Sequence, residues 1–127
     1  MSKILVVEDD PMIRDVLARR LMIEGYQVIT AADGAHGVHR ARVERPDLIV
    51  MDMGMPVLNG WQATSRIRSM PVTRAIPIIA LTAYAMTQDR TKCLGVGCDE
   101  FEPKPVDFAR LHKKIQELLS TAEQQGM

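Results

Sequence analysis

Apolar residues recur along the chain in five short runs that begin about 20 to 30 residues apart. The runs are, in order, Ile4–Val7, Tyr26–Thr30, Leu48–Met51, Ile76–Leu81 and a weaker Cys98–Phe101. Each has the length of a strand and is bounded by turn residues. Because the runs are almost continuously apolar, we expect strands that are buried on both faces, as in a parallel sheet.

The stretches between these runs have the spacing of amphipathic helices. The apolar stripes are Ile13, Val16, Leu17 and Leu21; Trp61, Thr64, Ile67 and Met70; and Phe108, Leu111, Ile115 and Leu118. Helix boundaries are predicted at Asp10-Pro11 and Asp33 as N-terminal caps, at Gly25 as a C-terminal glycine, and at Gly95 and Gly97 as the end of the fourth helix. The pattern predicts an α/β fold, (βα)₅, with a doubly wound five-stranded parallel sheet.

Length and charge narrow the classes of function. The 127 residues suit one domain, which we assign to residues 1–122, followed by a polar tail over residues 123–127. Sixteen basic and sixteen acidic residues give no net charge, so no bulk field favours nucleic acid or a membrane surface. The two cysteines suit small buried residues in a reducing compartment. Without a signal peptide or a membrane-length apolar segment, a cytoplasmic location is expected.

Polar side chains follow four of the five predicted strands. They are Glu8, Asp9 and Asp10 after the first, Asp52 after the third, Thr82 and Ala83 after the fourth, and Lys104 and Pro105 after the fifth. In an open parallel sheet the strand ends form the binding crevice, so these residues are expected to lie together. Clustered carboxylates repel one another unless a cation shares them. Oxygen ligands without His or Cys favour Mg²⁺, with Mn²⁺ as a second option.

Each part of this pattern has a plainer interpretation on its own. The acids after the first strand could simply cap a helix, and Asp10 is expected to do so. Asp52 is harder to explain structurally, because a carboxylate directly after a buried strand is unfavourable unless it is paired or bound to metal. A carboxylate can also be a nucleophile that forms an aspartyl phosphate. Only the combination with Thr82 and Lys104 is specific.

The chain resembles the receiver domains of bacterial response regulators, in particular the single-domain regulators of the chemotaxis type, over essentially its whole length. The matching segments are Ile4 to Asp10, Pro46 to Pro56, Asn59-Gly60, Ile78 to Ala83 and Lys104-Pro105. The resemblance implies a flavodoxin-like strand order, 2-1-3-4-5. It also implies a phosphorylation-dependent switch of a two-component system or phosphorelay. Such a domain is not a conventional enzyme, since it only promotes its own phosphorylation and slow dephosphorylation.

The resemblance assigns roles position by position. Asp52 is the phosphoacceptor, Thr82 contacts the phosphoryl group through its hydroxyl, and Lys104 pairs with it. The metal ligands are Glu8 through a water, Asp9, Asp52 and the backbone carbonyl of Gly54. Pro105 follows a cis peptide bond.

Further roles concern switching and the lifetime of the phosphorylated form. Thr82 and Phe101 are the expected switch residues, although Phe101 lacks the hydroxyl group that many members of the family carry there. Gly54 and Tyr84 are expected to tune how long the phosphoryl group persists. Thr82 and Phe101 would remodel a face formed by the fourth helix, the fifth strand and the fifth helix, through which a downstream protein is bound.

Partners and alternatives follow from the same comparison. The phosphodonor is expected to be a sensor histidine kinase or a histidine phosphotransfer protein, and the chain a monomer or a weak phosphorylation-dependent dimer without nucleic-acid or membrane contacts. Alternatives are a receiver fragment of a larger regulator or of a hybrid kinase, an aspartyl-nucleophile phosphatase, and a flavodoxin-like cofactor binder. The phosphatase would require a second acid at Gly54, and the cofactor binder a phosphate loop where three acids stand.

Overall fold

The computed structural model describes residues 1–83 and 87–125, in which five strands alternate with five helices. The strands are β1 (Lys3–Val7), β2 (Gln27–Ala31), β3 (Leu48–Asp52), β4 (Ile78–Thr82) and β5 (Glu100–Pro103). The helices are α1 (Pro11–Ile23), α2 (Gly34–Glu44), α3 (Gly60–Ser69), α4 (Thr87–Val96) and α5 (Phe108–Gln125). All strand pairs are parallel, in the order β2-β1-β3-β4-β5. The predicted fold class and strand order are confirmed.

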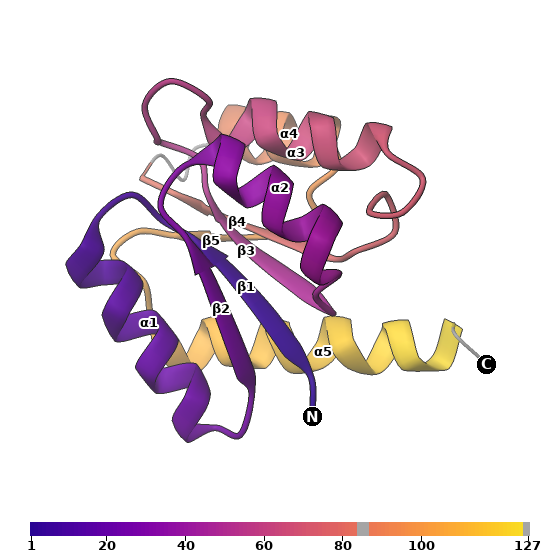
Figure 1. The fold of residues 1–127 in the computed structure, drawn as a ribbon. Coiled ribbons are helices and arrows are strands. Elements are labelled where there is room, and N and C mark those ends of the chain that lie inside the picture. Colours follow the sequence, from indigo (N-terminus) through magenta and orange to yellow (C-terminus); the bar gives the residue numbers. More distant parts are fainter. Residues whose placement is uncertain (84–86, 126–127) are drawn as a thin grey trace.

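The helices cover both faces of the sheet, with α1 and α5 on one side and α2, α3 and α4 on the other (Figure 1). Successive residues of a strand point to opposite faces, so the alternating residues of one strand feed two separate cores. Leu5 and Ile49 belong to the core under α2, α3 and α4, whereas Ile4 and Leu48 belong to the core under α1 and α5. This double burial explains why the strands read as continuous apolar runs.

Two strands begin two residues later than predicted. The fourth strand begins at Ile78 rather than at Ile76, because the intervening Pro77 has no amide hydrogen to give to the sheet and contributes only its carbonyl, which accepts from Ile49. The fifth strand begins at Glu100, two residues later than predicted. The amide of Cys98 donates to the carbonyl of Cys93, so Cys98 belongs to the turn that ends α4.

Most predicted helix ends are confirmed. The Asp10 carboxylate accepts from two amides of the first turn of α1, Asp33 caps α2, and Gly25 has a φ of 97° after α1. Gly97, with a φ of 108°, follows the last residue of α4, whereas Gly95 lies inside that helix. The predicted polar tail from residue 123 coincides with the last turn of α5, which ends at Gln125, and with residues 126–127, which lie outside the described part.

A buried ion-pair cluster joins β5 to α5. Glu102 is fully buried, and its carboxylate accepts from Lys114 at 2.8 Å and from Arg110 at 3.0 Å. Lys114 also donates to the carbonyl of Phe101 at 2.6 Å. The two cations compensate the charge that burial would otherwise destabilise. Within the described residues, no helix is both long and apolar enough to cross a membrane.

Candidate functional site

Three carboxylates meet where β1 and β3 end. Asp52 is the last residue of β3, while Glu8 and Asp9 directly follow β1. Val7 pairs with Met51, so the register brings Glu8 level with Asp52. One oxygen from each of the three carboxylates lies within 4.8 Å of the others. Glu8 and Asp52 are buried and Asp9 is exposed, so the cluster is closed to solvent on the side of the first two carboxylates and accessible at Asp9.

Lys104 extends into this cluster from the loop after β5. Its ammonium lies 3.0 Å from Asp52 Oδ1 and 3.4 Å from Glu8 Oε1. The Lys104 amide donates to the Thr82 carbonyl at 2.7 Å, and the Lys104–Pro105 peptide bond is cis. The hydrogen bond to Thr82 holds the backbone of Lys104 beside the end of β4, within reach of Asp52.

The two buried carboxylates have opposite pKa shifts. Burial, and then the hydrogen bond to Asp52 and the negative charge of Asp52, raise the pKa of Glu8 to about 8. Burial would also raise the pKa of Asp52, but hydrogen bonds from Glu8, from the Gly54 amide and from Lys104 outweigh it and lower that pKa. Without a cation, Glu8 is therefore protonated near neutral pH and donates to ionised Asp52.

The pKa of Lys104 shows the same balance. Burial works to lower the pKa of its ammonium, but the hydrogen bonds and charges of Asp52 and Glu8 prevail and raise it. Asp52 is thus an ionised carboxylate beside a charged lysine, as a nucleophile toward a phosphoryl group requires.

A pocket of about 440 Å³ opens above Asp52. The residues that line it are Asp52, Met53, Gly54, Trp61, Thr82, Ala83, Lys92 and Lys104. Thr82 is only 3% exposed, and the Gly54 amide donates to Asp52 Oδ1 at 3.1 Å. Four predicted site residues, Asp52, Gly54, Thr82 and Lys104, therefore surround one hollow.

The predicted switch residue Phe101 is not among the residues that line this pocket. Phe101 is partly buried against the core under α2, α3 and α4, with the cations of Arg90 and Lys114 at 5.3 Å and 5.5 Å from its ring centroid. Tyr84 lies outside the described residues.

Sequence reasoning missed Lys92 and placed Trp61 only in an apolar helix stripe, yet both residues line the pocket. Trp61 follows Gly60, where an added Cβ would lie 2.3 Å from the carbonyl oxygen of Asp52. A glycine at this position lets α3 begin directly against the end of β3. The signal in the sequence was the pair Asn59-Gly60, since Asn59 forms a capping box with Gln62 at the start of α3.

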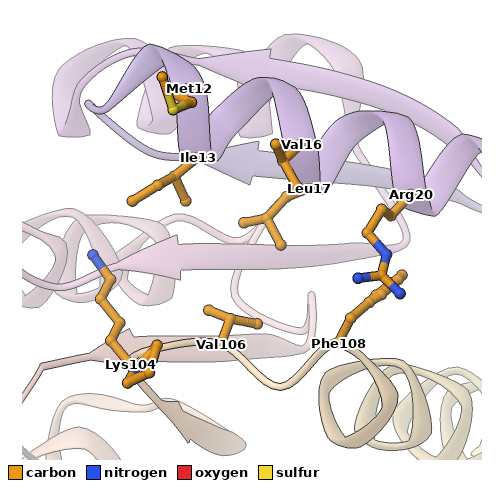
Figure 2. Close-up of a pocket in the computed structure, with 9 residues that line it drawn as sticks. Met12, Ile13, Val16, Leu17, Arg20, Lys104, Val106 and Phe108 are labelled. Carbon is orange, nitrogen blue, oxygen red and sulfur yellow. The ribbon is translucent and has the colours of Figure 1, made fainter.

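A second hollow, apolar and about 350 Å³ in volume, lies beside the first. Figure 2 shows side chains of α1 facing Val106 and Phe108 across it, with Lys104 at one end and the Arg20–Phe108 pair at the other. Ile13 is 37% exposed and Val16 is 49% exposed, so part of the predicted α1 stripe is open to solvent, as is the neighbouring Met12. Lys104 borders both hollows.

The carboxylate cluster suits a hard divalent cation. Its ligand atoms are all carboxylate oxygens, which Mg²⁺ prefers, and it holds more carboxylates than Lys104 alone can neutralise. A divalent cation, present in addition to the Lys104 ammonium, would replace the proton that Glu8 holds near neutral pH. The residues present therefore fit Mg²⁺.

Comparisons with known proteins agree with this geometry. The family model of the response regulator receiver domain matches residues 4–116. The protein PilH of Pseudomonas aeruginosa is 38% identical over 94% of this chain and 99% of its own length. The receiver domain of the sensor histidine kinase PA1611 from the same organism, solved with a magnesium ion in its active site cleft, is 40% identical with a TM-score of 0.87 and covers 94% of this chain and 98% of that one.

The chain thus belongs to the response regulator receiver domain family, whose members are phosphorylation-dependent switches of two-component signalling. Other relatives are longer. The probable transcriptional regulator ycf27 of Cyanophora paradoxa is 40% identical over 96% of this chain but only 50% of its own length. The chain spans about half the length of such regulators.

Proposed function

We propose that Asp52 accepts a phosphoryl group from a phosphohistidine in a Mg²⁺-dependent reaction. The observation that carries the proposal is the contact between ionised Asp52 and the Lys104 ammonium at 3.0 Å, inside a cluster of three carboxylates. Glu8, Asp9, Asp52 and the carbonyl of Gly54 would hold Mg²⁺, and Mn²⁺ would fit the same oxygen ligands. When bound, the metal supplies positive charge to the oxygens of the phosphoryl group.

The residues of the chain perform the remaining tasks. A carboxylate oxygen of Asp52 attacks phosphorus while the bond to the donor nitrogen breaks in line. Lys104 pairs with a phosphoryl oxygen, and the Thr82 hydroxyl donates to another. Both groups already border the pocket, so transfer requires little rearrangement of the protein.

The switch would act through Thr82 and Phe101. Movement of Thr82 toward the phosphoryl group, with an inward turn of the Phe101 ring, would alter the face formed by α4, β5 and α5. Phosphorylation shifts the population only as far as the phosphoryl group binds one conformation better than the other. Gly54, which leaves the pocket open, and Tyr84 would tune the lifetime of the acyl phosphate.

The phosphodonor would be a protein, either a sensor histidine kinase or a histidine phosphotransfer protein. The apolar groove beside Lys104 supports this, because a donor helix seated between α1 and Val106 would bring its phosphohistidine to the pocket above Asp52. The exposed side chains of Met12 and Val16 would supply the apolar contacts.

The cellular setting follows from this function. The chain would act in the cytoplasm as a receiver domain over residues 1–122 with a polar tail over residues 123–127. It would be monomeric or a weak phosphorylation-dependent dimer, binding a downstream protein rather than nucleic acid or membrane. The similarity to PilH over 99% of that protein's length favours a single-domain regulator. The alternative of a receiver in a larger regulator or hybrid kinase has support from ycf27 and PA1611.

Incubation with acetyl phosphate and Mg²⁺ tests the phosphoacceptor. We expect the protein to gain the mass of one phosphoryl group and Asp52→Asn to gain none, because an amide is not a nucleophile toward phosphorus. Asp15→Asn, a change at an exposed position of α1, is the control and should be labelled like the unchanged protein. Labelling of Asp52→Asn at the normal rate would disprove the assignment.

A further inference from the structure

The pocket above Asp52 contains a second lysine that the proposed reaction does not use. Lys92 of α4 lines the pocket, and its ammonium lies 4.5 Å from the centroid of the Trp61 ring on α3. The helices α3 and α4 lie next to each other on the same side of the sheet (Figure 1). Trp61 and Lys92 thus form a wall of the pocket, in addition to the four lining residues with assigned roles.

Among the side chains of residues 1–83 and 90–122, no carboxylate is paired with the ammonium of Lys92. Lys104 pairs with Asp52 and Glu8, whereas the contact recorded for Lys92 is the aromatic ring of Trp61. A cation on a tryptophan face is held in place while its charge stays available to a ligand. Of the residues that line the pocket, one is an acid and two are lysines, so the space above Asp52 favours anions.

The pocket is larger than a phosphoryl group requires. Its volume is about 440 Å³, whereas the centre of one water molecule needs only about 10 to 15 Å³ of such space. In an in-line transfer the leaving group lies on the side of phosphorus opposite to Asp52, toward the opening of the pocket. The leaving group therefore departs through the space that Lys92 helps to line, where the charge of its ammonium acts on it.

We propose that Lys92, held against Trp61, is a specificity-determining residue that, among small-molecule phosphodonors, favours those whose leaving group departs as an anion. This inference rests on the proposed role of Asp52. With an acyl phosphate, the Asp52 oxygen bonds to phosphorus, the bond between phosphorus and the acyl oxygen breaks, and its electron pair leaves on a carboxylate without any proton. The ammonium of Lys92 attracts the carboxylate as it forms.

A nitrogen donor has the opposite charge pattern. In phosphoramidate the bond to nitrogen breaks and the electron pair leaves on an amine, which departs as neutral ammonia from a nitrogen that was already protonated. The positive charge of that nitrogen is repelled by Lys92. The same lysine therefore assists one class of small donor and opposes the other.

Replacing Lys92 by methionine tests the inference, because methionine keeps the length and helix preference of the side chain and removes its charge. Phosphorylation is measured by mass, with Mg²⁺ present, for acetyl phosphate and for phosphoramidate separately. We expect Lys92→Met to slow labelling by acetyl phosphate about fivefold, the upper range for a solvent-accessible ion pair, and to leave labelling by phosphoramidate unchanged or faster.

Three further proteins make the outcome decisive. Lys92→Arg keeps the charge and should restore the preference for acetyl phosphate, and Lys113→Met, an exposed change on α5, should leave both rates unaltered. Trp61→Leu should weaken the preference because it removes the ring that holds the lysine. Trp61 is the sole tryptophan, so its fluorescence reports directly whether Lys92→Met removes a cation from the ring.

The results separate this inference from the proposed function. If neither donor labels the unchanged protein, the phosphoacceptor role of Asp52 fails. If both donors label the unchanged protein, and Lys92→Met either slows both reactions equally or slows neither, Lys92 does not set the donor preference. The inference is then overturned, while the phosphoacceptor role of Asp52 stands. Thermal unfolding of each variant establishes that a slower reaction does not come from loss of the fold.

Discussion

At the residue scale, the site depends on two carboxylates that differ in protonation. Glu8 and Asp52 are both buried, yet the pKa of Glu8 is raised to about 8 while that of Asp52 is lowered. Lys104 can compensate one negative charge, and the lower pKa belongs to the carboxylate that it approaches more closely. The resulting proton on Glu8 makes both stability and metal binding dependent on pH.

The metal-free protein should lose stability as the pH rises through this range. The folded-state pKa of Glu8 lies above its ordinary value of 4.5, so its favourable contribution is complete below pH 4.5 and disappears as the pH passes about 8. We expect urea unfolding in the presence of a chelator to show a fall of about 2 kcal/mol across that window. Glu8→Gln, which keeps a hydrogen-bond donor without titrating, should reduce this fall; an identical pH dependence in the variant would contradict the assignment.

At the element scale, the active-site loops are placed by helices and strands anchored elsewhere. The loop that carries Lys104 lies between β5 and α5, and the Glu102 cluster joins those two elements. The capping box of Asn59 and the close approach at Gly60 fix the start of α3 beside Asp52. Residues with no proposed chemical role therefore determine where Asp52 and Lys104 lie.

The Glu102 cluster provides a test of this dependence. Lys114→Met leaves the buried carboxylate of Glu102 with a single cation, that of Arg110, whose side chain is largely exposed. We expect the free energy of unfolding to fall by about 2 kcal/mol, since an incompletely paired buried charge is destabilising. Lys113→Met, at the exposed neighbouring position, should change it by less than about 0.5 kcal/mol. Similar losses in both variants would show that α5 is not fixed by this cluster.

At the scale of the whole molecule, the site lies where the winding of the sheet reverses. From β1 the chain continues to β2 on one side of the sheet, and from β3 it continues to β4 and β5 on the other side. The three carboxylates lie at the ends of β1 and β3, the two adjacent strands between which this change of direction occurs. A cation bound there would connect the two halves of the sheet. Metal binding and global stability should therefore be coupled.

Removing the metal tests that coupling. Adding Mg²⁺ at about 100 times its dissociation constant should raise the free energy of unfolding by about 2.7 kcal/mol, and a chelator should reverse the change. The affinity for Mg²⁺ should rise with pH up to about 8, because the metal displaces the proton of Glu8. Asp9→Asn should weaken the Mg²⁺ effect. An unchanged melting temperature with and without Mg²⁺ would show that the carboxylates do not bind it.

The sequence sufficed for the fold and for the groups now gathered around Asp52, because strand-length apolar runs and the acids that follow them are local patterns. It did not suffice for Lys92 or for the exact start of β5. Which residue of α4 reaches Trp61 depends on how two helices pack, and no local periodicity encodes that contact. The fifth apolar run gave a strand start two residues too early, because Cys98 is apolar yet belongs to the turn that ends α4.

Lys104 forms part of both the acidic pocket and the apolar groove. A phosphoryl group on Asp52 places about two negative charges beside this ammonium and draws it toward the pocket. On the proposed function, the edge of the groove beside a spent donor would then differ from the edge beside the loaded donor. Release of the spent donor would be favoured by the transfer itself, and one donor molecule would serve many copies of this chain in succession.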